Sequence, residues 1–254
     1  MIDPQKELLD LSSDRVFGPT LEGEGEFLGH PSIFLRMAGC NLTCKNFASP
    51  DSPHGCDSFI AWSVHNKMTF EQVWQQYFVD KNYRANLKNG AILKLSGGEP
   101  IRSQKQLAKF VRYLVAQLGF CPRIDFETNA TIKPDDCWVD EFRATFTTSP
   151  KLSTNGDPES KTYNPEVLKW HKNHGSGFKF VITCAADIEE IWRKYVVDDL
   201  GINIPKDRIW FMPACGSRAE HIEKAPAVAE YATTMGVRFS PRLHLLIWDM
   251  ALGR

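Results

Sequence analysis

Short apolar runs alternate with amphipathic stretches along most of this chain. Apolar runs of four to eight residues are typical of buried strands, whereas apolar residues three and four positions apart mark one face of a helix. The runs that predict strands are 31–38, 91–95, 123–126, 145–148, 178–183 and 208–212, and residues 237–239 start a final extended piece. The stretches with a helical pattern are 69–78, 107–118, a short segment opened by Pro134, 164–173, 187–196 and 218–235.

Strands therefore alternate with helices about six times, which is the signature of βαβ units and of a parallel sheet. We expect one α/β domain over residues 1–254, with the fold of an incomplete TIM-like barrel of about six parallel strands. Its 43% hydrophobic content is enough for one sizeable core. Outside the repeat, we expect residues 1–15 to form an N-terminal arm, 152–161 a mobile loop and 240–254 a C-terminal tail near the substrate.

Composition excludes several classes of function. The net charge is −1 with no basic stripe, so non-specific nucleic-acid binding has no electrostatic support. No apolar run approaches the length of a membrane span, and the first residues lack the apolar core of a secretory signal. Seven cysteines, an odd number, argue against a disulfide framework and for a reducing compartment. We expect a cytoplasmic protein that binds neither nucleic acid nor membrane.

Three of the cysteines follow the first predicted strand. Cys40 and Cys44 have three residues between them, and Cys56 follows after eleven more. Thiolates are soft ligands, and a group of them selects iron–sulfur or zinc over hard cations. A closed site needs four ligands, so three thiols leave one metal position open for chemistry.

Other unusual residues stand just after predicted strands. They are Gly97-Gly98-Glu99, Glu127-Thr128-Asn129 and Ser149-Pro150-Lys151. Sites in parallel α/β folds form at the carboxyl ends of the strands, so we expect these residues beside the three thiols. A glycine-rich acidic loop, 18–26, precedes the first of these strands, and its glycines allow close approach of the backbone to a ligand.

In this combination and order, the chain resembles the radical S-adenosylmethionine (SAM) superfamily and, within it, the family of 7-carboxy-7-deazaguanine synthases. The similar motifs run from about residue 16 to 248, and therefore span most of the chain. They are Gly-Pro-Thr-x-x-Gly-Glu-Gly (18–25), Phe-x-Arg-x-x-Gly-Cys (34–40), Cys-Asp-Ser (56–58), Gly-Gly-Glu-Pro (97–100), Glu-Thr-Asn (127–129), Ser-Pro-Lys (149–151) and Leu-His (243–244).

The resemblance implies a lyase that uses a 4Fe-4S cluster, SAM and Mg²⁺. One electron, from a donor such as flavodoxin, cleaves SAM to a 5′-deoxyadenosyl radical that abstracts hydrogen from the substrate. The family converts 6-carboxy-5,6,7,8-tetrahydropterin to 7-carboxy-7-deazaguanine and ammonia, in the biosynthesis of 7-deazaguanines such as queuosine. Its members are homodimers, and we expect the same here.

The resemblance also implies roles for individual residues, with none catalytic beyond the cluster and the cofactor. The cluster ligands would be Cys40, Cys44 and Cys56, and Ser58 would bind Mg²⁺. The residues expected to contact SAM are Gly55, Cys56, Asp57, Gly97, Gly98, Glu99, Thr128, Asn129, Ser149, Pro150 and Lys151. The residues expected to contact the substrate are Leu21, Glu22, Gly23, Glu24, Arg36, Ser96 and His244. The glycines at 97 and 98 would let SAM approach the backbone, which a Cβ would block.

Two features depart from the family pattern. The usual cysteine spacing is C-x3-C-x2-C, but Phe47 occupies the third position and Cys56 follows an insertion, so that 45–55 forms a lengthened cluster loop. Gly55 stands where an aromatic residue often stacks on adenine, and we hypothesise that Phe47 stacks there instead. Glu22 replaces a common glutamine. Either side chain accepts hydrogen bonds from the donor edge of a pterin, and the charged one is the stronger acceptor.

Two other functions stay open. Another radical SAM enzyme, such as a glycyl-radical activase, would lack the acidic loop and the late Leu-His. A non-catalytic zinc protein would use His54 as a fourth ligand, but the spacing is irregular for zinc modules. Lys94 is interpreted as a lysine at the edge or rim of the sheet. The remaining cysteines are interpreted as small, partly buried thiols: Cys121, Cys137, Cys184 and Cys215.

Overall fold

The computed structural model describes residues 2–47, 54–197 and 199–251. Nine strands in these ranges form one sheet, in the order β3-β1-β2-β4-β5-β6-β7-β8-β9. The strands are β1 (Leu8–Leu21), β2 (Pro31–Met37), β3 (Asn66–Thr69), β4 (Ile92–Gly97), β5 (Ile124–Thr128), β6 (Thr145–Thr148), β7 (Gly177–Ile182), β8 (Ile209–Pro213) and β9 (Arg238–Phe239).

The sheet is mostly parallel. From β2 through β9 in spatial order, every neighbouring pair is parallel, whereas β1 runs antiparallel to both β2 and β3. The prediction of an α/β fold with a parallel sheet is confirmed. The parallel strands number seven in the described ranges, where about six were expected, because the chain adds the two-residue β9. The outermost strands are β3 and β9, so the described sheet is open.

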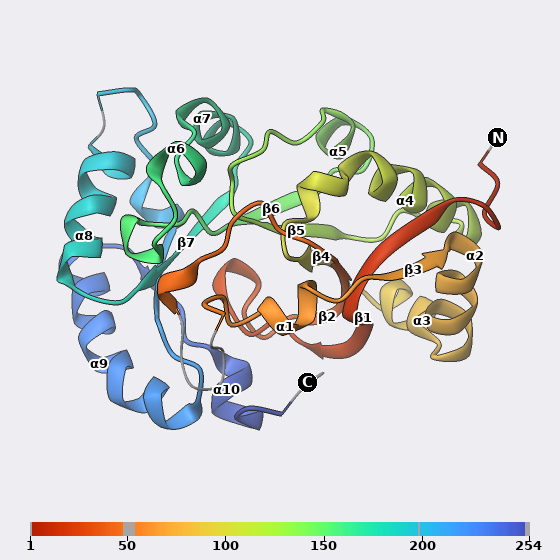
Figure 1. The fold of residues 1–254 in the computed structure, drawn as a ribbon, viewed down its shortest axis with the longest axis horizontal. Helices are drawn as coiled ribbons and strands as arrows, with labels where there is room; N and C mark the ends of the chain where they lie inside the picture. The colour runs from red at the N-terminus through yellow and green to blue at the C-terminus, as the bar shows by residue number, and fades with distance from the viewer. Residues whose placement is uncertain (1, 48–53, 198, 252–254) are drawn as a thin grey trace.

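Helices connect the parallel strands and surround the sheet (Figure 1). The α-helices are α1 (Phe59–Trp62), α2 (Phe70–Val73), α3 (Tyr83–Lys88), α4 (Gln104–Leu118), α5 (Cys137–Asp140), α6 (Glu159–Thr162), α7 (Pro165–Asn173), α8 (Ala185–Ile191), α9 (Arg218–Met235) and α10 (Leu243–Trp248). The π-helical segments η3 (Trp74–Asp80) and η6 (Trp192–Val196) continue α2 and α8. The 3₁₀ turns are η1 (Gly25–Phe27), η2 (Lys45–Phe47), η4 (Pro100–Ser103), η5 (Ser153–Asn155) and η7 (Lys206–Arg208).

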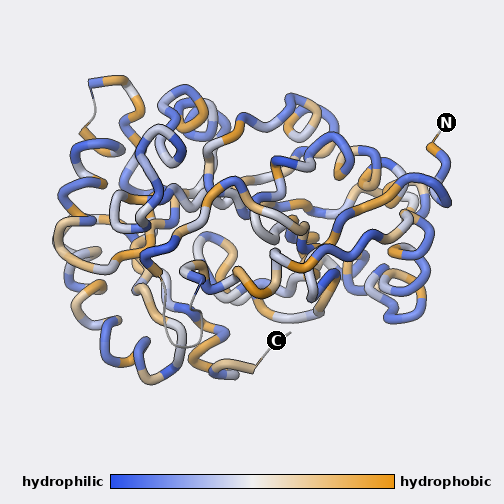
Figure 2. The backbone as a smooth tube through the Cα atoms, in the orientation of Figure 1, coloured by the Kyte–Doolittle hydropathy of each residue, from blue (hydrophilic) through white to orange (hydrophobic). Residues whose placement is uncertain are grey.

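Alternation along each parallel strand gives the sheet two different faces. In β4, Leu93 and Leu95 belong to the apolar core beneath the helices, whereas the polar residues Lys94 and Ser96 alternate with them along the strand. Successive side chains of a strand point to opposite faces. The other central strands contribute Asp125, Thr147 and Lys179 to what we call the polar face. Figure 2 shows hydrophobic and hydrophilic residues alternating along the outer helices, as expected when one side of each helix is buried.

The N-terminal segment does not form the expected arm. Residues from Leu8 onward belong to β1, and Leu9 and Leu11 are fully buried against the core. The pattern Leu-Leu-Asp-Leu was short and lay in a polar context, yet it pairs with both β2 and β3. Of the other expected segments, residues 48–53 of the cluster loop and 252–254 of the tail lie outside the described residues.

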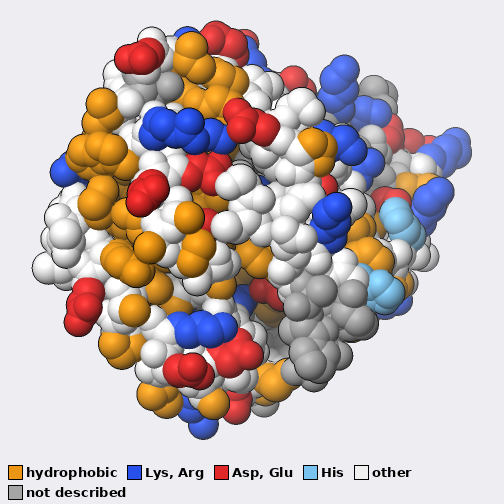
Figure 3. Space-filling view, turned by 60° about the vertical axis from the view of Figure 1, so that its left-hand side comes forward, with side chains coloured by type: hydrophobic (Ala, Val, Ile, Leu, Met, Phe, Trp, Pro, Cys, Tyr) orange, Lys and Arg blue, Asp and Glu red, His pale blue; other side chains and the backbone are white. Residues whose placement is uncertain are grey.

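The face in Figure 3 mixes acidic, basic and apolar side chains, with the apolar ones gathered on its left half. None of the described helices is both long enough and apolar enough to cross a membrane.

Candidate functional site

From here on, the name cluster loop covers residues 38–58, which carry all three thiols. This segment leaves the carboxyl end of β2, and Gly55 lies against the backbone of Cys44 and Lys45. A Cβ at Gly55 would lie 2.6 Å from the Cys44 carbonyl oxygen and 2.5 Å from the Lys45 Cα, and its φ is +104°. Only glycine fits this contact. Because the backbones touch there, Cys56 arrives beside Cys44 in spite of the eleven residues between them.

A carboxylate from the opposite side of the site holds this loop. Asp157 accepts hydrogen bonds from the backbone N–H groups of Thr43 (2.9 Å) and Cys44 (2.7 Å), and from the Thr43 hydroxyl (2.7 Å). Asn155 donates to the Cys44 sulfur at 3.7 Å. Residues 152–161 were expected to be a mobile loop, but in the structure Asn155 and Asp157 hold Cys44 in place.

The three thiols form one electrostatic unit. Burial, together with the nearby Glu99, Cys44 and Cys56, raises the pKa of Cys40 to about 11. Burial also raises the pKa of Cys44 and of Cys56, whereas the ammonium group of Lys151 lowers both. A metal that binds here therefore displaces protons. Lys151 comes from the loop after β6 and also donates to the Ser149 carbonyl at 2.9 Å, so Ser-Pro-Lys and the thiols share one site as predicted.

The backbone packing at the end of β4 requires glycine at positions 97 and 98. A Cβ at Gly97 would lie 2.1 Å from the Met37 carbonyl oxygen, and one at Gly98 would lie 2.1 Å from that of Gly39. The Gly98 and Glu99 N–H groups donate to the same two carbonyls. Close packing of this turn on the end of β2 thus explains the glycine pair. Access for a cofactor, the reason expected from the sequence, is not needed to account for it.

Glu99 joins the ends of two strands. Its carboxylate is 1% exposed and accepts from the Ile101 N–H (3.0 Å), the Thr128 hydroxyl (2.8 Å) and the Asn129 N–H (2.7 Å). Burial raises its pKa, and these donors oppose the shift. Asn129 in turn donates to Asn41 of the cluster loop at 2.9 Å. The predicted SAM residues of β4 and β5 are therefore part of one network with the cluster loop.

The acidic loop lies against the polar face of the sheet. Glu22 is 4% exposed, and its Oε2 lies 2.9 Å from the Lys94 ammonium, which also contacts Asp125 at 2.7 Å. Burial raises the pKa of Glu22, and Lys94 opposes this shift. The interpretation of Lys94 as an edge or rim lysine is wrong, because the acidic loop covers the face to which it points.

A second cation, Lys179 of β7, lies between Glu24 and Glu127. It contacts Glu24 and lies 2.5 Å from Glu127. Burial would raise the pKa of Glu127, but Lys179 lowers it to about 2. Burial is likewise outweighed at Glu24, whose pKa is held well below its usual range by Lys179 and Arg242.

Arg242 connects the acidic loop to the cluster loop. Its guanidinium lies 2.8 Å from Glu24 and 3.1 Å from Asp57, and donates to the Cys215 carbonyl. The neighbouring Leu243 N–H donates to the Gly23 carbonyl at 2.8 Å. The C-terminal segment is therefore joined to the acidic loop at Gly23 and Glu24.

The other predicted residues lie around this network. His244, in α10, lies against Gly23, and burial lowers the pKa of its imidazole.

The Ser58 hydroxyl donates to Asp57 at 3.2 Å. Arg36 pairs with Asp14 at 2.7 Å. The rest are Leu21, which ends β1, Ser96, which donates to Glu127 at 3.4 Å, and Pro150, which is buried beside Ser149.

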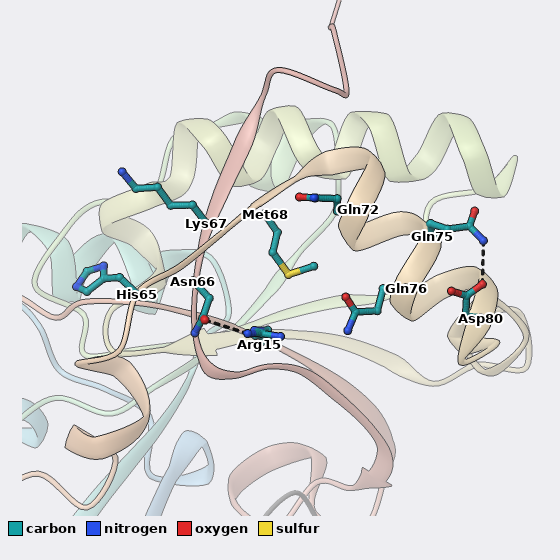
Figure 4. Close-up of a pocket in the computed structure, with 9 residues that line it drawn as sticks. All are labelled: Arg15, His65, Asn66, Lys67, Met68, Gln72, Gln75, Gln76 and Asp80. Atoms are coloured by element: carbon teal, nitrogen blue, oxygen red, sulfur yellow. Dashed lines mark hydrogen bonds between the residues drawn. The ribbon is translucent and has the colours of Figure 1, made fainter.

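A hollow of about 640 Å³ lies elsewhere, over β1, β3 and η3 (Figure 4). Arg15 bonds to Asn66 at its base, and Gln75 bonds to Asp80 at one end. None of the predicted site residues lines it. The lining residues are Arg15, His65, Asn66, Lys67, Met68, Gln72, Gln75, Gln76 and Asp80.

Both the sequence and the fold are similar to those of known proteins. No family model matches the chain. A 7-carboxy-7-deazaguanine synthase of Leptospira interrogans is 30% identical over 245 residues, which cover 92% of this chain and 94% of that protein. The chain belongs to the 7-carboxy-7-deazaguanine synthase family. The synthase of Pyrobaculum aerophilum is 29% identical over 239 residues, with 92% and 94% covered. The crystal structure of QueE from Escherichia coli has the same fold, with a TM-score of 0.59, 19% identity and 92% and 95% covered.

Membership of the 7-carboxy-7-deazaguanine synthase family confirms the predicted family and the prediction of an enzyme. Sequence reasoning did not assign several charged residues of the site. Lys94, Asp125 and Lys179 each interrupt an apolar strand, and that interruption was the available signal. Arg242 is two residues from the predicted His244. Asp157 had no signal beyond its place in an Asn-Gly-Asp turn.

Replacing Asp157 by alanine should loosen the cluster loop. The variant loses three hydrogen bonds to Thr43 and Cys44, so the Cys44 thiol, 5% exposed in the folded protein, should be alkylated faster by iodoacetamide. Peptide mass spectrometry of the metal-free protein measures the rate. Asp207→Ala, at an exposed position, is the control and should leave the rate unchanged. Equal rates in the two variants would mean that Asp157 does not brace the loop.

Proposed function

We propose that this protein is a radical SAM lyase that converts 6-carboxy-5,6,7,8-tetrahydropterin to 7-carboxy-7-deazaguanine and ammonia, for 7-deazaguanine (queuosine-type) biosynthesis. The observation that carries the proposal is that three separated thiols meet the Gly-Gly-Glu, Glu-Thr-Asn and Ser-Pro-Lys turns at one edge of the sheet. This edge, in a chain of the 7-carboxy-7-deazaguanine synthase family, has the ligands and polar groups that the reaction needs.

The donor set fits a 4Fe-4S cluster. Cys40, Cys44 and Cys56 would each bind one iron through a soft thiolate, and the cluster with SAM would supply the radical chemistry. Asn155 would donate to a cluster sulfur ligand, which is one of the ways in which a protein tunes such centres. The chain's own contribution is to hold the three thiols in place through Gly55 and Asp157.

The zinc alternative has less support. The His54 ring packs on Phe59 with centroids 4.5 Å apart. Across the described ranges, no three His, Cys, Asp or Glu side chains converge on a single metal ion. A cluster does not require such convergence, because each thiolate binds a different iron atom.

The same site would hold SAM and the substrate. Asp57, Gly97, Gly98, Asn129, Ser149 and Lys151 would contact SAM. Glu22, Glu24, Arg36 and His244 would contact the pterin, with the Arg36 guanidinium suited to its carboxylate. Ser58 would bind Mg²⁺ through its hydroxyl oxygen, a hard ligand of the kind that this ion prefers. We further propose a cytoplasmic homodimer that accepts electrons from a flavodoxin-like donor.

Product analysis tests the proposal. Anaerobically reconstituted protein, incubated with SAM, dithionite, Mg²⁺ and the carboxytetrahydropterin, should give a product with the mass of the pterin minus ammonia. The Cys44→Ala variant is the control and should give none. Reductive cleavage of SAM without a deazaguanine product would favour the activase alternative and overturn the proposal.

A further inference from the structure

Lys94 stands in the middle of a strand, where a charge is hard to accommodate. Its side chain is 2% exposed, and its neighbours Leu93 and Leu95 are fully buried. Burial alone would lower the pKa of Lys94, but Asp125 and Glu22 outweigh it and hold the pKa above its ordinary range. The lysine is therefore charged, and two carboxylates compete for one ammonium group.

The two carboxylates are not equally satisfied. Asp125 accepts from Lys94 and from the hydroxyls of Thr145 (2.7 Å) and Thr147 (3.0 Å). Apart from its contact with Lys94, Glu22 accepts one hydrogen bond in the described ranges, from the Glu24 N–H to Oε1 at 3.3 Å. Its Oε2 lies 2.9 Å from Lys94, yet this ion pair lacks the geometry of a directed hydrogen bond. A buried carboxylate oxygen with open acceptor positions requires a donor from elsewhere.

We propose that Lys94 is a positioning residue that keeps Glu22 ionised and oriented, so that its carboxylate accepts two adjacent N–H groups from the substrate. The inference rests on the proposed function and specifies the recognised chemistry: a nitrogen heterocycle with an amino group beside a ring N–H. An ionised carboxylate offers two acceptor oxygens to such an edge, whereas the protonated acid presents a donor of its own. Charge-assisted hydrogen bonds of this kind are also the stronger ones.

Among the charged groups around Glu22, Lys94 is the one that favours its ionised form most strongly. Lys94 from β4, Glu127 from β5 and Lys179 from β7 face its carboxylate. Lys179 is already between Glu24 and Glu127, and Glu127 itself opposes ionisation of Glu22. Without Lys94, burial and Glu127 would raise the pKa of Glu22 further and favour the protonated acid.

Lys94→Met tests this with the reconstituted enzyme. The KM for the carboxytetrahydropterin should rise by about tenfold or more, with a smaller change in kcat, because a charge-assisted contact is lost. The acid limb of kcat/KM should move up by about one pH unit or more, because Glu22 stays protonated to higher pH. Glu22→Gln should raise the KM as well but remove that limb, because an amide does not titrate. The Lys94→Met substitution should then produce no further shift.

A matched control separates positioning from general damage. Lys194 in η6 is also largely buried and paired, with Glu159 and Glu190, but lies outside the site. Lys194→Met should lower the melting temperature without moving the acid limb. If the limb of Lys94→Met coincides with that of the wild type, or if its shift persists with Gln at position 22, the proposal is overturned.

A substrate-free measurement distinguishes this proposal from the proposed function. In Lys94→Met, the raised pKa of Glu22 should make the melting temperature increase as pH falls from 8 to 5, and adding Glu22→Gln should reduce that increase. An unreduced increase would mean that Lys94 does not control Glu22. If the wild type forms no deazaguanine but the melting comparison holds, the proposed reaction fails while the coupling of Lys94 to Glu22 stands.

Discussion

Replacing Cys56 by alanine is expected to abolish both iron retention and product formation. The variant leaves two thiolates, Cys40 and Cys44, to hold a cluster that would use three. The contact of Gly55 with the Cys44 backbone remains, so the loop keeps its course and the change is confined to the ligand. Iron and sulfide per chain after anaerobic reconstitution measure retention, and the mass of the pterin product measures turnover.

Cys121→Ala provides the control. Cys121 is an exposed thiol outside the site, so this variant should retain iron and activity. If Cys56→Ala instead reconstituted a full cluster, the third ligand would be another residue and the assignment from the Cys-Asp-Ser motif would be wrong. Because Phe47 stands at the superfamily's usual third position, the experiment asks whether that position or the motif around Cys56 identifies the ligand.

Much of the fold could be predicted because its elements are encoded locally. Apolar runs bounded by turn residues located β2 and β4 through β9 to within a few residues, and Thr69 caps the helix that begins at Phe70, as its position suggested. Parallel strands put their carboxyl ends at one edge. The grouping of Gly97, Asn129 and Lys151 near the thiols therefore followed from strand order alone.

The rest depended on contacts between distant segments. Lys94 is buried because the acidic loop, which begins some seventy residues earlier in the chain, covers the polar face of the sheet. Asp157 braces Cys44 across a sequence separation of 113 residues. Arg242 meets Asp57 across 185. The hydrophobic pattern of a strand or helix predicts which of its own residues are buried, but not which distant residues they contact. The charged residues within apolar strands could therefore be recognised from the sequence, whereas the oppositely charged residues that pair with them could not.

Lys179→Met should produce the largest loss of stability among the charged residues of the site. The side chain is 3% exposed, and its removal leaves Glu127 without its closest cation, whereas Glu24 keeps Arg242. Removing one partner of a buried ion pair costs about 3–5 kcal/mol. We expect the free energy of unfolding in urea at pH 7 to fall by about this amount. Lys179→Met with Glu127→Gln should recover part of it, because the uncompensated charge is gone.

The stability of the wild type and that of Lys179→Met should change with pH in opposite directions. In the wild type, the pKa of Glu127 is about 2, below its ordinary value near 4.5, so its stabilising contribution is complete above pH 4.5 and is lost as pH falls toward 2. Without Lys179, burial raises the pKa of Glu127, and the variant should instead gain stability as pH falls from 7 to 5. Urea unfolding at several pH values distinguishes the two slopes. A variant that loses stability in parallel with the wild type, or a double variant no more stable than Lys179→Met, would show that Lys179 does not compensate Glu127.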